Sequence, residues 1–211
     1  MKRSGLLLAA GLIGMYEVGV QLPEYMDRHD GFTAARAYCR SVGKPLLRIG
    51  VHRSPLEPPN GDVTLDLDPS VTDIARGVIL GDERNMAMFT DRQFGVAFNE
   101  HTLEHLITAE DVAESVRECL RVADYAIFLF PSRNLLVGKV LWSPSALGRF
   151  FGGPFGAHNL QLDMVQGGVR VTPLEGPEAD RSFTFIPIPH AQVRGSGSMV
   201  IGSRWTSRPL P

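Results

Sequence analysis

The 211-residue sequence is poor in lysine, in cysteine and in clustered positive charge. Lysine occurs only at Lys2, Lys44 and Lys139, and the formal net charge is −2. Without a basic block to neutralise phosphates, the composition excludes a general nucleic-acid binder. The two cysteines, Cys39 and Cys119, are too far apart for a metal-binding cysteine pair. We expect Cys119 to be a buried free thiol on the apolar side of a helix.

An apolar segment near the N-terminus is short for a membrane span. Residues 5–20 follow Lys2 and Arg3 and contain one charged residue, Glu17. As a helix, they would reach roughly 24 Å, less than a hydrocarbon core of about 30 Å. The sequence allows four interpretations of this segment: a membrane anchor, a contact with a membrane-protein complex, a signal peptide or a buried core helix. We expect a membrane-associated protein whose folded domain faces the cytoplasm.

Short apolar stretches then alternate with helical patterns. Residues 30–43 predict a helix, and residues 108–123 predict another, with Thr108 and Asp111 as a capping box. This alternation is typical of a doubly wound, mostly parallel α/β sheet. The predicted strands of that sheet are residues 45–51, 62–68, 78–82, 94–99 and 125–131.

The pattern changes after Pro131. Residues 159–174 alternate on both sides of Gly167 and Gly168, which predicts a C-terminal β-hairpin, and residues 182–193 predict an edge strand. The last residues are rich in glycine, serine and proline, and such a tail suits binding to a partner protein. We therefore divide the chain into an apolar N-terminal helix, an α/β domain and an extended C-terminal tail, with bounds 1–21, 22–190 and 191–211.

Residues 46–131 resemble the class I S-adenosylmethionine (SAM)-dependent methyltransferases, particularly the type 11 group. "LLRIGV" is similar to the first strand of that family, and "VTLDLDP" to its second strand, which ends in an acidic residue. "HTLEHL", set between the fourth strand and the next helix, is the most specific part of the resemblance. The resemblance implies a Rossmann-like methyltransferase fold, SAM as cofactor and methyl transfer to an acceptor that the sequence does not identify.

The resemblance also implies where the cofactor binds. Gly50 lies at the end of the first predicted strand. Asp66 ends the second strand, where an acidic side chain can accept hydrogen bonds from the ribose hydroxyls. Asp82 ends the third strand, where the family contacts the adenine amino group. Each carboxylate also has a structural alternative: Asp66 could form a turn before Pro69, and Asp82 could belong to a Gly-Asp turn.

Four more residues are implied at the same site. Asn99 and Glu100 follow the fourth strand and would face the methionine part of the cofactor or the substrate. His101 and His158 would border the substrate pocket. Because methyl transfer can depend mostly on positioning the acceptor, we name no general base, and we expect no metal.

The first loop departs from the family pattern. That loop typically reads Gly-x-Gly, because the backbone must pass close to the cofactor. Here Gly50 is followed by Val51 and His52. The departure favours a second hypothesis, in which the protein is a degenerate, non-catalytic methyltransferase-fold subunit of a membrane-associated complex.

A third hypothesis concerns His101, Glu104 and His105, which match the H-x-x-E-H pattern of inverted zinc proteases. On a helix, the two histidines would share a face, and Glu175 or Glu178 could supply another ligand. However, the motif lies at a predicted strand-to-helix junction. That context favours the methyltransferase hypothesis.

Overall fold

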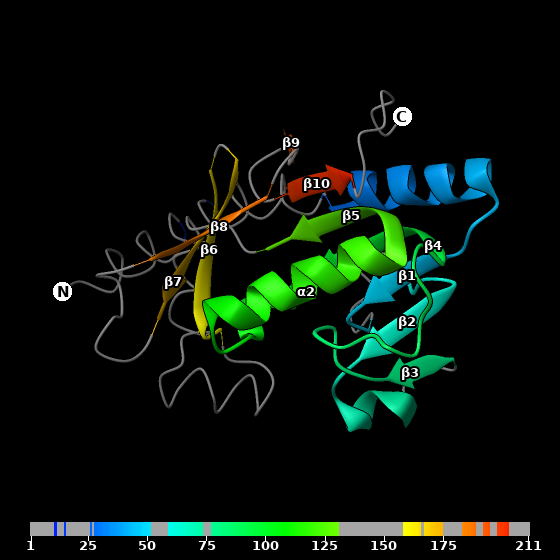
Figure 1. Cartoon of the computed structure of the whole chain (residues 1–211), viewed down its shortest axis with the longest axis horizontal. Coiled ribbons are helices and arrows are strands. Elements are labelled where there is room, and N and C mark those ends of the chain that lie inside the picture. Colours follow the sequence, from blue (N-terminus) through cyan, green and yellow to red (C-terminus); the bar gives the residue numbers. More distant parts are fainter. Residues whose placement is uncertain are drawn as a thin grey trace.

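The chain has a doubly wound α/β fold, as the sequence predicts (Figure 1). The computed structural model describes most of the central part of the chain. Among its described residues, the main sheet has seven strands, and a separate sheet has three. The described residues are Gly11, Met15, Met26, 28–51, 59–73, 77–130, 158–165, 167–174, 183–188, 192–194 and 198–202.

The first five strands of the main sheet are parallel and lie in the order β3-β2-β1-β4-β5. Strands β1, β4 and β5 are buried along their whole length. Such burial is expected where helices cover both faces of a parallel sheet, and it explains the continuous apolar runs in the sequence. The strands are β1 (Leu46–Ile49), β2 (Val63–Asp66), β3 (Val78–Leu80), β4 (Phe94–Glu100) and β5 (Ala123–Leu129).

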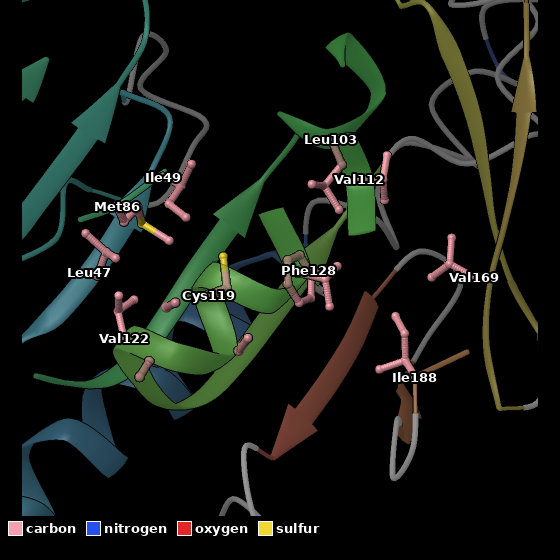
Figure 2. Packing of buried hydrophobic residues seen from close by; sticks show 14 of the residues in the cluster. Leu47, Ile49, Met86, Leu103, Val112, Cys119, Val122, Phe128, Val169 and Ile188 are labelled. Carbon is pink, nitrogen blue, oxygen red and sulfur yellow. The ribbon is translucent and has the colours of Figure 1, made fainter. Parts of the chain in front are cut away.

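Helices cover opposite faces of this sheet. Residues 28–42 form one helix, and α2 (Ala109–Val122) forms the other. Alternate residues of a strand point to opposite faces: Leu46 packs in the core under the first helix, whereas Leu47 packs in the core under α2. Figure 2 shows Cys119 on the inner side of α2, and its thiol is free and buried, as the sequence predicts.

The predicted capping box fixes the start of α2. Thr108 Oγ1 accepts a hydrogen bond from the Asp111 N–H at 3.1 Å, and Asp111 Oδ2 accepts one from the Thr108 N–H at 3.0 Å. Two short 3-10 helices, η1 (Pro69–Asp73) and η2 (Leu103–His105), lie in the connections. The H-x-x-E-H stretch therefore lies at the junction between β4 and α2, with a single 3-10 turn in place of a helix.

The separate sheet is antiparallel and contains the predicted hairpin. Strands β6 (Leu160–Val165) and β7 (Gly168–Pro173) pair on either side of Gly167, and β8 (Thr184–Pro187) pairs with β7. Gly167 has a φ of 84°, which favours glycine. Ile186 of this sheet is buried in the same core as Leu103 of η2. The small sheet thus packs against the α2 side of the molecule (Figure 1).

The C-terminal region differs from the expected extended tail. Residues Gln192–Arg194 form β9, and residues Ser198–Gly202 form β10. Strand β10 pairs antiparallel with β5 and carries β9 on its other side, so both belong to the main sheet. The surrounding region is rich in glycine and serine, but β10 itself reads Ser-Met-Val-Ile-Gly, and β-branched residues such as Val200 and Ile201 favour a strand.

Among the described helices, none is long and apolar enough to cross a membrane. Of the apolar segment 5–20, only Gly11 and Met15 are described, and both are helical and exposed. The rest of that segment lies outside the described residues. A membrane contact through residues 5–20 therefore stays a prediction.

Candidate functional site

The strand order reverses between β1 and β4, and ligands of doubly wound sheets bind at the carboxyl ends of the strands beside such a reversal. We call this place the switch point and define it by Gly50, Asp66 and Glu100. Gly50 has a φ of 85°, a conformation that other residues rarely adopt. A Cβ there would lie 3.0 Å from Thr102 Cγ2 and 3.5 Å from the Glu100 carbonyl oxygen. The chain after β1 thus passes tightly against the end of β4.

Asp66 lies at the end of β2, beside the chain that follows Gly50. Its Oδ2 accepts a hydrogen bond from the Val51 N–H at 2.8 Å, and its Oδ1 accepts one from the Asp68 N–H at 2.9 Å. The second bond forms the turn that the sequence offered as the structural alternative. Each carboxylate oxygen has two acceptor sites, so these bonds leave capacity for a ligand hydroxyl.

Asp82 forms an ion pair within the protein. Arg84 Nε and Nη2 donate to its carboxylate at 2.9 and 2.6 Å, and Arg84 Nη1 donates to Asp111 at 2.7 Å. The hydrogen bonds from Arg84 lower the pKa of Asp82. A bridge between Asp82 and Asn85 closes the turn after β3, in agreement with the structural alternative. A ligand amino group would have to compete with Arg84 for this carboxylate.

Asn99 is buried and points toward α2. Its Nδ2 donates to Glu83 Oε2, and its Oδ1 accepts from Thr102 Oγ1 at 2.6 Å. Glu83 Oε2 also accepts from Ser115 Oγ of α2 at 2.7 Å. Burial raises the pKa of Glu83 despite these hydrogen bonds. The Asn99 side chain therefore connects β4 to α2 through the Glu83 carboxyl group, whose burial no sequence pattern predicts.

Glu100 pairs with Arg48 on the opposite face of the sheet. Arg48 Nη2 lies 3.0 Å from Glu100 Oε2, and each side chain is 2% exposed. Arg28 Nη1 lies 3.5 Å from the other carboxylate oxygen. Arg48 Nη1 also donates to the Pro59 carbonyl oxygen at 2.9 Å, just before β2. The Glu100 carboxylate, which was expected to face the cofactor, thus neutralises the charge of the buried Arg48.

His101 and Glu104 form a second polar group after β4. His101 has a φ of 54°, and its Nδ1 lies 3.3 Å from Glu104 Oε1. The zinc-protease hypothesis requires that His101 and His105 share one face of a helix. They do not, because His101 has a left-handed backbone conformation and precedes the single turn of η2. Although burial alone would raise the pKa of Glu104, the neighbouring histidines lower it to about 2.

His158 completes this group from a distant part of the chain. Its Nε2 lies 3.9 Å from Glu104 Oε1, and its ring meets His105 edge to face, with centroids 5.0 Å apart. The backbone N–H of Asn159 donates to the Glu104 carbonyl oxygen at 2.8 Å, and its Nδ2 donates to the His105 carbonyl oxygen at 2.7 Å. These bonds hold the segment before β6 against η2. The sequence alone could not pair His158 with Glu104 across 54 residues.

Most of the predicted site residues thus fall into two groups, whereas the side chains of Asp82 and Asn99 pair elsewhere, with Arg84 and Glu83. Gly50 and Asp66 lie together at the switch point, with the backbone of Glu100 beside them. His101 and His158 surround Glu104. The third ligands proposed for a zinc protease, which are Glu175 and Glu178, lie outside the described residues.

Comparison with known proteins gives structural neighbours only. No protein-family model matches the chain, and no curated protein matches its sequence. A SAM-dependent methyltransferase from Archaeoglobus fulgidus is 13% identical, with a TM-score of 0.42 over 82% of this chain and 93% of that one. A protein from Pyrococcus horikoshii OT3 is 12% identical, with a TM-score of 0.40 over 82% and 88%. The candidate function therefore depends on the residues at the switch point.

Proposed function

We propose that the protein binds SAM at the switch point and transfers its methyl group to an acceptor molecule. The observation that carries this proposal is the position of Asp66. It ends β2, beside the reversal of strand order, and holds the backbone that follows the positive-φ Gly50. An acidic residue at this position of a doubly wound sheet hydrogen-bonds the ribose hydroxyls of a bound nucleotide.

Methyl transfer requires the protein to bind the cofactor and to position the acceptor. Bound SAM would supply an activated methyl group to a lone pair of the acceptor, and its sulfonium would become a neutral thioether. Asp66 would accept hydrogen bonds from the ribose, and Gly50 would let the backbone approach the cofactor closely. Positioning the acceptor in line with the methyl group accounts for much of the acceleration in such reactions, so a general base is not required.

The proposal includes a type 11-like protein with an altered first loop. The "HTLEHL" stretch supports the first part. The second part is supported by Val51, which follows Gly50 in place of a small residue and is buried. The altered loop would narrow the space at the methionine end of the cofactor.

A non-catalytic subunit is the second candidate, and internal pairing favours it. The carboxylates of Asp82 and Glu100 are bonded to Arg84 and Arg48. In a retired enzyme, residues released from cofactor binding can adopt such structural roles. The apolar segment 5–20 would then attach the subunit to a membrane-associated complex.

Calorimetric titration of SAM and S-adenosylhomocysteine into the full chain tests the proposal. We expect micromolar binding by the wild type and a loss of about 10- to 100-fold in Asp66→Asn, because a hydrogen bond to a charged group contributes about 1.5–3 kcal/mol. Asp62→Asn is the matched control. Asp62 precedes the opposite end of β2 and also accepts a backbone hydrogen bond, from Leu46 at 2.8 Å.

Two outcomes would contradict the proposal. Equal affinity for SAM in the wild type and in Asp66→Asn would contradict the assignment of Asp66 to the cofactor site. Absence of binding by wild-type protein with an intact circular dichroism spectrum would favour the non-catalytic subunit.

A further inference from the structure

We infer that Glu104, His105 and His158 bind one divalent transition-metal ion of the zinc class where η2 meets the segment before β6. The inference is independent of SAM binding and goes beyond methyl transfer. It also differs from the zinc-protease hypothesis, in which Glu104 would be a base between two histidine ligands. Here Glu104 is itself a ligand.

The ligand atoms already lie close together. One nitrogen from each histidine and one oxygen of Glu104 all lie within 4.8 Å of one another, and His158 Nε2 is 3.9 Å from Glu104 Oε1. In a tetrahedral zinc site with bonds of about 2.0–2.1 Å, ligand atoms lie about 3.3–3.4 Å apart. Small side-chain rotations of the histidines would close the remaining gap.

The environment of the Glu104 carboxylate is the strongest evidence for a bound metal ion. Its side chain is 2% exposed, and neither oxygen accepts a hydrogen bond of standard geometry from the described residues. Among those residues, only histidine nitrogens approach it to ion-pair distance. A buried carboxylate that lacks hydrogen bonds of standard geometry is costly, even with imidazole nitrogens 3.3 and 3.9 Å away. A divalent cation would supply the missing charge.

The backbone around the site is held before any ion binds. Asn159 donates hydrogen bonds to the carbonyl oxygens of Glu104 and His105, so the segment carrying His158 is fixed against η2. The rings of the two histidines are partly exposed, which leaves a path for an ion. A site with a preformed backbone loses little conformational freedom on binding.

The donor set selects the kind of ion. Two imidazoles and one carboxylate suit Zn²⁺, Co²⁺ and Fe²⁺, whereas Mg²⁺ and Ca²⁺ prefer oxygen ligands. Three protein ligands leave one position of a tetrahedral ion for water or a substrate atom. His101, with Nδ1 3.3 Å from Glu104 Oε1, would orient the carboxylate toward the ion.

The test uses the full chain without a histidine tag, stripped of metal with a chelator. Co²⁺ is titrated while the visible absorption of tetrahedral cobalt is recorded, and Zn²⁺ is titrated by calorimetry. We expect one ion per chain, displacement of Co²⁺ by Zn²⁺, and no binding of Mg²⁺ at the same concentration. His158→Gln and His105→Gln should each lower the affinity at least about tenfold.

Matched variants separate this site from other histidines and from the SAM site. His29→Gln, on the helix that covers the opposite face of the sheet, should bind Co²⁺ like the wild type. Asp66→Asn should also keep full metal affinity, whatever its effect on SAM. Circular dichroism of each variant establishes that it is folded.

Three results would overturn the inference. They are no binding of Co²⁺ or Zn²⁺ by the folded wild type, a stoichiometry other than one, and wild-type affinity in both folded histidine variants.

Discussion

Glu83 is a carboxyl group whose partners among the described residues are all neutral. Asn99 and Ser115 donate hydrogen bonds to it, the Thr102 hydroxyl lies 3.2 Å from Oε2, and the side chain is buried. Because burial penalises the charged form more than these donors stabilise it, the pKa of Glu83 is raised. The protonated form is thus favoured in the folded state relative to the unfolded state.

This shift predicts a pH dependence of stability. A raised pKa adds stability at pH values below the pKa of the unfolded chain, and that contribution is lost as the pH rises through the folded pKa. In Glu83→Gln the loss cannot occur. The free energy of unfolding of Glu83→Gln minus that of the wild type should therefore increase from pH 4 to pH 8, measured by urea denaturation. A difference that stays constant over this range would contradict the raised pKa.

At the residue scale, the sequence predicted some roles and missed others. The position of Asp66 at a strand end was predictable from the apolar pattern before it, but its side chain also forms the turn that the sequence offered as the alternative role. The pairing of Arg48 with Glu100 was not predictable, because an arginine inside an apolar run does not reveal its partner on another strand. Likewise, only the folded chain brings His158 to Glu104.

At the scale of elements, α2 is the clearest case of local control. Its capping box satisfies two backbone N–H groups at the helix start, and its apolar face packs on the main sheet. Arg84 also reaches Asp111 in the first turn, which ties the turn after β3 to this helix. The start of α2 therefore affects the geometry of Asp82 as well.

Removing the cap should measurably destabilise the protein. Thr108→Ala deletes the side-chain acceptor for the Asp111 N–H, and we expect a loss of about 1 kcal/mol in the free energy of unfolding. Urea denaturation followed by circular dichroism measures this loss. Glu114→Ala is the control, since its pairing with Arg117 is exposed and should contribute less than about 0.5 kcal/mol. Equal stability of the two variants would show that the capping box contributes nothing.

Elements with local signals were predictable, and elements that depend on distant pairing were not. The strands β1 to β5 are short apolar runs, and α2 has a cap and an amphipathic pattern. The hairpin of β6 and β7 was marked by its two glycines. Strand β10, in contrast, is a run of three apolar residues, Met199–Ile201, between glycine- and serine-rich stretches, and this run does not reveal that its partner is β5.

At the scale of the whole molecule, β9 and β10 complete the main sheet. Without them, β5 would be an edge strand with seven buried and mostly apolar residues. An exposed edge of this kind readily pairs with other chains. The C-terminal strands therefore have a protective role that an extended tail would lack.

Truncation after residue 191 should accordingly cause self-association. It should also lower the melting temperature by about 2–8 °C, the shift expected for a loss of about 1–2 kcal/mol in a chain of this size. Light scattering coupled to size-exclusion chromatography and thermal unfolding measure the two effects. Truncation after Gly202 keeps both strands and is the control. If both truncated chains stayed monomeric and melted together, β9 and β10 would not contribute to the main sheet in solution.

The pairing of β5 with β10 also sets an order of events during synthesis. Leu129 pairs with Ser198, so the ribosome must add 69 further residues before the partner of β5 exists. At about 5–20 residues per second, this takes roughly 3–14 seconds. During that interval, β5 of the nascent chain has an unpaired edge. A chaperone that covers such an edge would therefore have its greatest effect on the yield of folded protein at this time.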